Sequence, residues 1–87
     1  MIEGAEEPPG LVDSSLKILS EMGVSGVSAT ACETAFVERQ HRLKFNAMVP
    51  VELWHCQFDR GDADPAVLVM VYWTTDDQWE LEDFNLG

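Results

Sequence analysis

Cysteine and histidine are the residue types in this chain that could support nucleophilic or metal chemistry. Cys32 falls in the first turn of a helix that the sequence predicts from Thr30, where backbone N–H groups favour a thiolate. His41 would leave the opposite face of that helix, after about 900° of rotation, so it cannot serve as the base. Because free cysteine is among the most buried residue types, we expect Cys32 to be a core residue beside Phe36.

The second cysteine also lacks a suitable partner. His55 and Cys56 are adjacent in a predicted strand, so their side chains point to opposite faces of the sheet. Cys32, His41, His55 and Cys56 have the right number of ligands for zinc, but no short chelating pair. We therefore expect free thiols, no catalytic residue, no metal and no other cofactor. A redox or metal protein that uses both cysteines is a third alternative.

Carboxylates dominate the last third of the chain. The full sequence has 16 Asp and Glu against 5 Lys and Arg, a formal net charge of −11, and no Lys or Arg follows Gly61. A surface of one sign steers oppositely charged molecules toward it. The candidate partner-binding residues are the acidic and aromatic side chains near the C-terminus: Asp76, Asp77, Trp79, Glu80, Glu82, Asp83 and Phe84.

This pattern predicts a docking surface for a basic protein, because electrostatics sets the encounter rate and buried aromatics supply affinity. Carboxylates spaced at ~3.4 Å per residue along a strand also match the scale of phosphates along a nucleic acid. Our first hypothesis is a non-enzymatic acidic protein-binding module, an inhibitor or regulator of a basic and possibly nucleic-acid-binding protein partner. Direct contact with nucleic acid is not expected.

Two other interpretations of the acidity are open. Charge on an edge strand keeps a protein from aggregating, and an excess of acid is also found in proteins adapted to high salt. Under this second hypothesis the chain is a small accessory or structural subunit of a larger complex or a homo-oligomer. A homodimer through the sheet would cover an apolar sheet face that two helices cannot cover.

The first half of the chain has helical patterns. A short helix is predicted from about Asp13 to Gly23, with Leu19 on its apolar side. Thr30 followed by Glu33 is a capping-box pattern, which predicts a second helix to about Leu43. Its apolar stripe would contain Ala29, Cys32, Phe36 and Leu43.

The second half has the alternation of strands. A strand is predicted from Leu43 to Val49, continuing after a bend at Pro50 as Val51 to Phe58. Ala66 to Trp73 is apolar on both faces, as in a central strand, and Gln78 to Phe84 alternates as a charged edge strand. The predicted fold is α+β: two N-terminal helices packed on a three- to four-stranded antiparallel β-meander.

The run from Leu19 to Ser25, followed by the predicted second helix, resembles the turn of a helix-turn-helix motif. The resemblance covers about twenty-five residues and would imply DNA binding. Glu33 and Glu38 would lie on the recognition helix, however, where they would repel phosphates. We therefore expect no binding of DNA.

The length of 87 residues predicts a single domain. Residues 1–10 are predicted to be a flexible acidic N-terminal tail, and residues 11–87 the domain. The N-terminus has neither the basic nor the apolar region of a secretory signal, so we expect a cytoplasmic protein. No apolar run is long enough to span a bilayer and basic residues are few, so membrane association is not expected.

Overall fold

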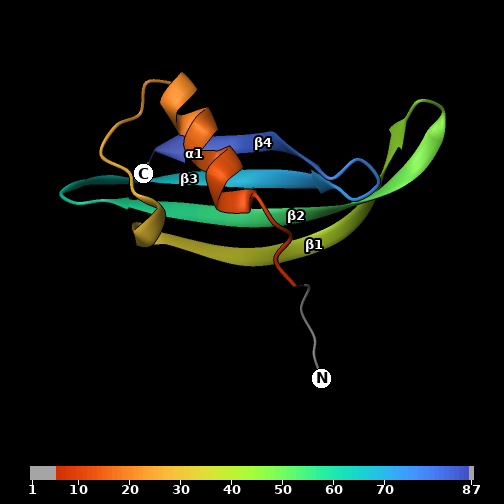
Figure 1. Cartoon of the computed structure of the whole chain (residues 1–87), viewed down its shortest axis with the longest axis horizontal. Helices are drawn as coiled ribbons and strands as arrows, with labels where there is room; N and C mark the ends of the chain where they lie inside the picture. Colours follow the sequence, from red (N-terminus) through yellow and green to blue (C-terminus); the bar gives the residue numbers. More distant parts are fainter. Residues whose placement is uncertain (1–5, 87) are drawn as a thin grey trace.

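A computed structural model describes residues 6–86, and within this range the chain forms one α-helix and one antiparallel sheet. Helix α1 (Leu11–Glu21) and the 3-10 turn η1 (Ala29–Ala31) precede the strands, as Figure 1 shows. The strands pair in chain order, which confirms the predicted meander: β1 (Cys32–Lys44), β2 (Ala47–Arg60), β3 (Ala63–Trp73) and β4 (Gln78–Leu86).

The prediction of two N-terminal helices is wrong, because residues 32–44 form the edge strand β1. The register between β1 and β2 shifts between Phe36 and Glu38, so Val37 is a bulge. Before this bulge the even-numbered side chains of β1 face α1, and after it the odd-numbered ones do. Cys32, Phe36 and Leu43 therefore point to one face at intervals of four and seven residues, which is the spacing expected of an amphipathic helix. Without a second helix the resemblance to a helix-turn-helix has no structural basis.

The predicted strand from Leu43 to Val49 is also wrong, because a hairpin turn interrupts it. β1 ends at Lys44, and Phe45 and Asn46 form a two-residue turn with φ of 52° and 64°. Positive φ at both turn residues gives the twist that joins antiparallel strands well. The alternation on the two sides of this turn looks continuous in the sequence, because the turn itself contains an apolar residue.

Pro50 lies inside β2 without a bulge. The last pair between β2 and β3 joins Val51 to Trp73, so β3 has ended where Pro50 begins. The Pro50 carbonyl accepts a hydrogen bond from the Thr74 hydroxyl on this side at 2.8 Å. Because the N–H and C=O of a strand residue point to the same side, the missing N–H removes no bond of the β2–β3 ladder.

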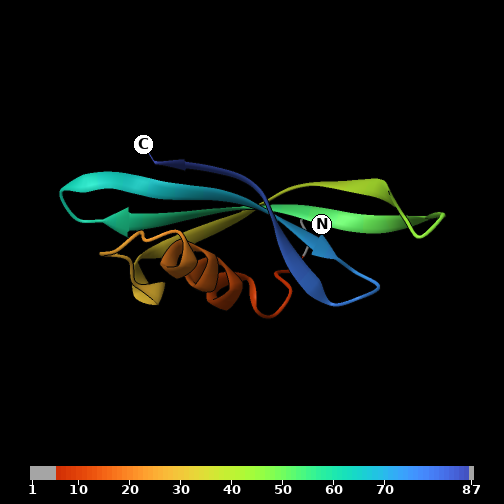
Figure 2. The same ribbon diagram turned by 90° about the horizontal axis from the view of Figure 1, so that it is seen from above.

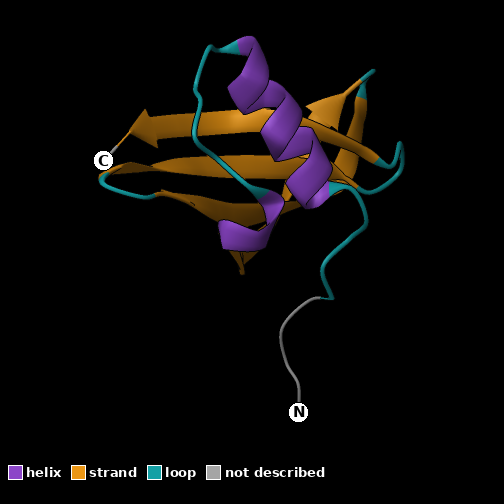
Figure 3. Cartoon of the chain, turned by 60° about the vertical axis from the view of Figure 1, so that its left-hand side comes forward, coloured by secondary structure: helices purple, strands orange, loops and turns teal. Residues whose placement is uncertain are grey.

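The main core lies between α1 and one face of the sheet (Figures 2 and 3). Alternation along β2 and β3 directs every second side chain toward the helix. Gly10 is the N-cap of the helix and has a left-handed conformation, with φ of 89°. The fully packed residues of this core are Leu11, Leu19, Trp54, Cys56, Phe58, Ala66, Leu68 and Met70.

A second, smaller core lies on the sheet face that is turned away from α1, here called the open face. Val51, Leu53 and Val71 are buried there, with Val69 and Trp73 packed against them. The strong twist carries the end of the β1–β2 hairpin behind the β3–β4 turn, as Figures 1 and 2 show. The open face is therefore covered at one end by the protein's own hairpin.

Part of the predicted N-terminal tail can be described. Residues 1–5 lie outside the described residues. The Pro9 carbonyl accepts a hydrogen bond from Trp79 Nε1 at 3.0 Å, and the Glu7 carboxylate accepts one from the Thr34 hydroxyl. Across residues 6–86, no helix is long and apolar enough to cross a membrane.

Candidate functional site

The predicted partner-binding residues of β4 are divided between the two faces of the sheet. Trp79 and Phe84 pair with residues whose side chains face α1. Glu80 and Asp83 pair with Val71 and Val69, whose side chains lie on the open face. The bulge at Glu82 inserts one residue between them, so the side chains of Glu80 and Asp83 point to the same face of the sheet. The acidic and aromatic side chains therefore do not form one mixed surface.

The two aromatic residues have structural contacts. Trp79 and Phe84 are partly buried and pack against the main core. The Trp79 ring lies 4.8 Å from the Tyr72 ring, between centroids, and its indole holds the Pro9 carbonyl just before α1. Both residues support the position of the helix, and their contact with a partner stays a prediction.

Two carboxylates of this region pair with cations of the β1–β2 hairpin. Arg42 binds both oxygens of Glu82, at 2.9 and 3.0 Å, and Lys44 pairs with Asp76. The Lys44 ammonium also lies 4.7 Å from the centroid of the Trp73 ring. These two ion pairs hold the curled hairpin against the β3–β4 end of the sheet, and we call them the hairpin clasp. The Arg42 hydrogen bonds lower the pKa of Glu82.

The other predicted carboxylates accept hydrogen bonds from neutral donors. Asp77 accepts one from the Tyr72 hydroxyl, Glu80 from the Trp73 indole at 2.8 Å, and Asp83 from the backbone N–H of the next residue at 2.9 Å. The Asp77 bond raises the pKa of Tyr72. Neutral donors do not cancel charge, so Asp77, Glu80 and Asp83 keep the β4 side of the molecule negative.

Ion pairing in the described part of the chain is confined to β1. Arg39 lies 3.9 Å from Glu52, and Arg42 and Lys44 form the clasp. Arg60 instead donates to two backbone carbonyls, at 3.3 and 3.1 Å. The hairpin is thus electrically balanced, whereas most other carboxylates of the described surface face solvent without a cation.

Sequence reasoning missed an exposed apolar cluster at the end of the hairpin. Leu43 is 69% exposed, Phe45 90% and Met48 60%. Leu43 and Met48 are paired across the hairpin, and Phe45 is the first residue of its turn. We call these three residues the apolar tip. Asn46, which tolerates positive φ, was the signal in the sequence that could have located the turn.

The two cysteines face each other on neighbouring strands. Cys32 Sγ and Cys56 Sγ are 3.4 Å apart, and both thiols are free. Burial, and then the hydrogen bond that the Cys32 thiol donates to Cys56 Sγ, raise the pKa of Cys32 to about 12, so Cys32 is a thiol at neutral pH. Burial likewise raises the pKa of Cys56. Within residues 6–86 there is no cluster of three or more His, Cys, Asp or Glu that could hold a metal ion.

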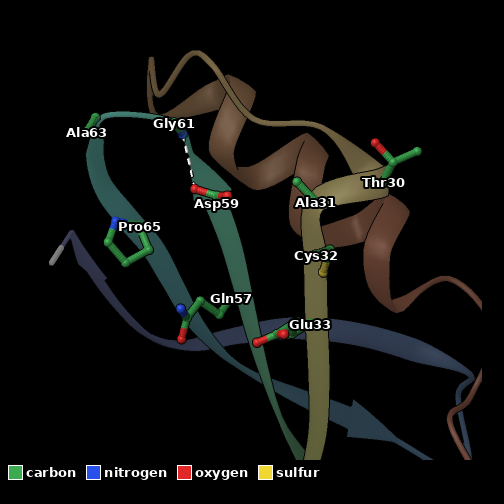
Figure 4. Close-up of a pocket in the computed structure, with 9 residues that line it drawn as sticks. All are labelled: Thr30, Ala31, Cys32, Glu33, Gln57, Asp59, Gly61, Ala63 and Pro65. Carbon is green, nitrogen blue, oxygen red and sulfur yellow. Dashed lines mark hydrogen bonds between the residues drawn. The ribbon is translucent and has the colours of Figure 1, made fainter.

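A shallow hollow lies at the end of the sheet away from the apolar tip (Figure 4). It has a volume of about 600 Å³ and is bordered by η1, β1 and the β2–β3 turn. Glu33 and Gln57 line it from paired positions of β1 and β2, and Asp59 accepts a hydrogen bond from the Gly61 N–H at 3.1 Å. Cys32 borders the hollow from β1, but its side chain points to the α1 face, away from Glu33 and Gln57.

Comparisons with protein-family models, with curated proteins and with solved structures give no match to this chain.

The fold brings the apolar tip and the acidic β3–β4 turn together on one side of the molecule. The Lys44–Asp76 contact places the acidic β3–β4 turn directly beside the hairpin that ends in the apolar tip. Such a combination of exposed apolar and acidic side chains suits contact with a protein surface.

Proposed function

We propose that this protein is a non-enzymatic acidic protein-binding module, an inhibitor or regulator that docks on a basic protein. The apolar tip supplies the anchor, and the carboxylates on the β4 side steer and select the partner. The observation that carries this proposal is the exposure of Phe45, 90% of whose surface faces solvent at the end of a projecting hairpin. Large aromatic side chains that enter a partner's pocket commonly dominate binding energy.

The backbone at the tip supports the same proposal. Phe45 has a φ of 52°, a region that glycine and asparagine adopt readily but a bulky aromatic residue rarely does. A residue that is both strained and exposed contributes little to folding. Selection for contact with a partner explains why an aromatic side chain stands where asparagine would be more stable.

The charge distribution favours a basic partner. The cations of the hairpin are already paired, so the tip is a nearly neutral part of a molecule with a net charge of −11. Asp77, Glu80 and Asp83 lie toward the β4 side and keep their charge. A complementary partner has an apolar pocket bordered by Lys and Arg, as in the groove of a nucleic-acid-binding protein. We place this interaction in the cytoplasm.

The experiment that tests this function is an affinity pull-down from the native lysate, eluted with a salt gradient. Wild-type protein is compared with Phe45→Asn, which removes the anchor but suits the turn. Met22→Asn is the matched control, since Met22 is also exposed, at 47%, but lies just after α1. We expect a basic protein that binds wild type and Met22→Asn and fails to bind Phe45→Asn. Equal recovery with Phe45→Asn would remove the tip from the proposal.

The electrostatic part is tested by neutralising carboxylates at the two ends of the molecule. Asp77→Asn combined with Glu80→Gln removes two charges near the β3–β4 turn, which lies beside the hairpin, and Asp62→Asn with Asp64→Asn removes two charges at the other end of the sheet. The first pair should lower the salt concentration at which the partner elutes, whereas the second pair should change it less. Equal effects would show that only net charge matters.

A homodimer through the sheet, within an accessory subunit, is the second candidate. The curled hairpin covers only one end of the open face. At the other end Ala35 is exposed, and Val67 and Val69 are only partly buried. Val67→Glu would place a charge in such an interface without entering either core cluster. Sedimentation velocity should show a wild-type dimer that this variant dissociates. A wild-type monomer at high protein concentration would eliminate this candidate.

A further inference from the structure

We propose that Cys32 and Cys56 form a redox modification site, in which reaction with a small disulfide such as oxidised glutathione joins the two thiols in an intrachain disulfide. The proposal is independent of the partner-binding function. The chain has two cysteines, and neither belongs to the apolar tip or to the carboxylates of the proposed docking surface.

Geometry is the first support. The two Sγ atoms are 3.4 Å apart, and a disulfide bond is about 2.05 Å long, so they are within about 1.4 Å of bonding distance. Cys56 pairs with Thr34, two positions from Cys32 on β1, so the cysteines occupy diagonal positions on adjacent strands. Diagonal neighbours on one sheet face are within side-chain reach. Closing the bond takes a rotation of the side chains and a small approach of the edge strand β1 to β2, because diagonal neighbours are about 7 to 8 Å apart and a disulfide joins Cα atoms about 4.4 to 6.8 Å apart. The strand register does not change.

Access is the second support, because it gives the reaction an order. Cys32 is partly exposed on the edge strand β1, whereas Cys56 is 0% exposed and belongs to the main core. A small disulfide in solution can reach Cys32 but not Cys56. Cys32 is thus the attacking thiol, and Cys56 is the resolving thiol that waits beside it.

The reaction balances as two thiol–disulfide exchanges. Cys32 gives its proton to solvent, and its sulfur attacks one sulfur of oxidised glutathione, which releases one glutathione and leaves a mixed disulfide. Cys56 then loses its proton to solvent and attacks Cys32 Sγ, which releases the second glutathione. Two protein thiols are oxidised, and one glutathione disulfide is reduced to two thiols.

The product would constrain the part of the fold that carries the apolar tip. A Cys32–Cys56 disulfide would close a loop of residues 33–55, which contains the hairpin turn and most of β1 and β2. A cross-link that closes such a loop restricts the unfolded chain and stabilises the folded one. The raised pKa of Cys32 keeps little thiolate at neutral pH, so the bond forms only under sustained oxidation.

The test uses the purified full chain, reduced and then incubated with oxidised glutathione, quenched with N-ethylmaleimide and analysed by intact mass and peptide mapping. We expect a species that is lighter by two hydrogens, has no alkylated cysteine and has a Cys32–Cys56 cross-linked peptide. Dithiothreitol should restore both alkylation sites. The oxidised protein should also unfold at a higher temperature than the reduced protein.

Single substitutions separate the two roles. Cys56→Ser should stop at a stable glutathione adduct on Cys32, and Cys32→Ser should leave Cys56 unmodified until the protein is unfolded. Circular dichroism before the reaction verifies that each variant is folded. A wild-type product that stops at the Cys32 adduct, a disulfide between two chains, or no reaction under oxidising conditions would overturn the proposal.

Discussion

Phe45 shows how a single residue can oppose the local preference of the backbone. Its φ of 52° is unfavourable for phenylalanine, and at 90% exposure its ring gains only a solvent-exposed contact with the Lys44 ammonium, 5.8 Å from the ring centroid. Phe45→Asn should therefore raise the free energy of unfolding by about 1 kcal/mol, since a strained bulky residue is replaced by one that suits the turn. Urea unfolding, followed by circular dichroism, measures this change.

The same substitution should abolish partner binding, so stability and binding move in opposite directions. Asn46→Gly is the control, because it changes the second turn residue, with φ of 64°, and leaves the apolar tip complete. This variant should keep its partner. If Phe45→Asn lowered stability, the strain assigned to Phe45 would be refuted, whatever happened to binding.

Cys32 provides a prediction on pH. Its pKa is raised from 9.0 to about 12, so the unfolded chain loses this proton at a lower pH than the folded protein does. The contribution of Cys32 to stability is fully present below the unfolded pKa and is lost as pH rises through the folded value. Under reducing conditions, the free energy of unfolding should fall between about pH 9 and pH 12.

Cys32→Ser identifies the share of this fall that belongs to Cys32. The variant should lose less stability over the same alkaline range than wild type does, although Cys56 and Tyr72 still contribute in the same direction. Identical alkaline profiles for wild type and Cys32→Ser would contradict the raised pKa of Cys32.

At the scale of elements, the hairpin clasp joins segments that are distant in sequence. Arg42 and Glu82 side chains are 28% and 39% exposed, so solvent screens their attraction. A double-mutant cycle with Arg42→Gln and Glu82→Gln should give a coupling energy of about 0.5 to 1 kcal/mol, toward the upper end for exposed pairs because the contact is bidentate. A coupling indistinguishable from zero would mean that the hairpin curls without this pair.

The clasp also has an acid dependence of defined sign. Arg42 lowers the pKa of Glu82 below its ordinary 4.5, so the coupling is present above that value and is lost as pH falls through the folded pKa. The cycle measured below the folded pKa should therefore give a smaller coupling than the cycle measured at neutral pH. An unchanged coupling would indicate a hydrogen bond that does not depend on the Glu82 charge.

Most strands could be predicted from alternation, and the exception has an identifiable cause. Runs such as Ala66 to Trp73 alternate or are apolar throughout, and they became β3 and the neighbouring strands. In β1 the bulge at Val37 broke the alternation and created a helical spacing. Pairing with β2 decides this segment, and a contact with a distant strand cannot be read from a local pattern.

At the scale of the whole molecule, the acidic excess could be predicted from the sequence, but which carboxylates pair with cations in the folded protein could not. The acidic excess after Gly61 is evident from the sequence. Arg42 and Lys44 precede it by many residues, and only the curl of the hairpin brings them to Glu82 and Asp76. The apolar tip was hidden for a related reason, because the turn at residues 45–46 lies within an unbroken alternation.

The central claim is that one acidic molecule uses charge for encounter and the apolar tip for retention. The most direct measurement is the kinetics of binding to the recovered basic partner, by surface plasmon resonance over a range of salt concentrations. The association rate should fall with added salt, because the screening length shortens from ~10 Å at 0.1 M to ~3 Å at 1 M salt. Phe45→Asn should raise the dissociation rate at least tenfold, which corresponds to about 1.4 kcal/mol or more for an anchor residue, and should change the association rate little. An association rate that does not respond to salt, or a dissociation rate unchanged by Phe45→Asn, would contradict the central claim.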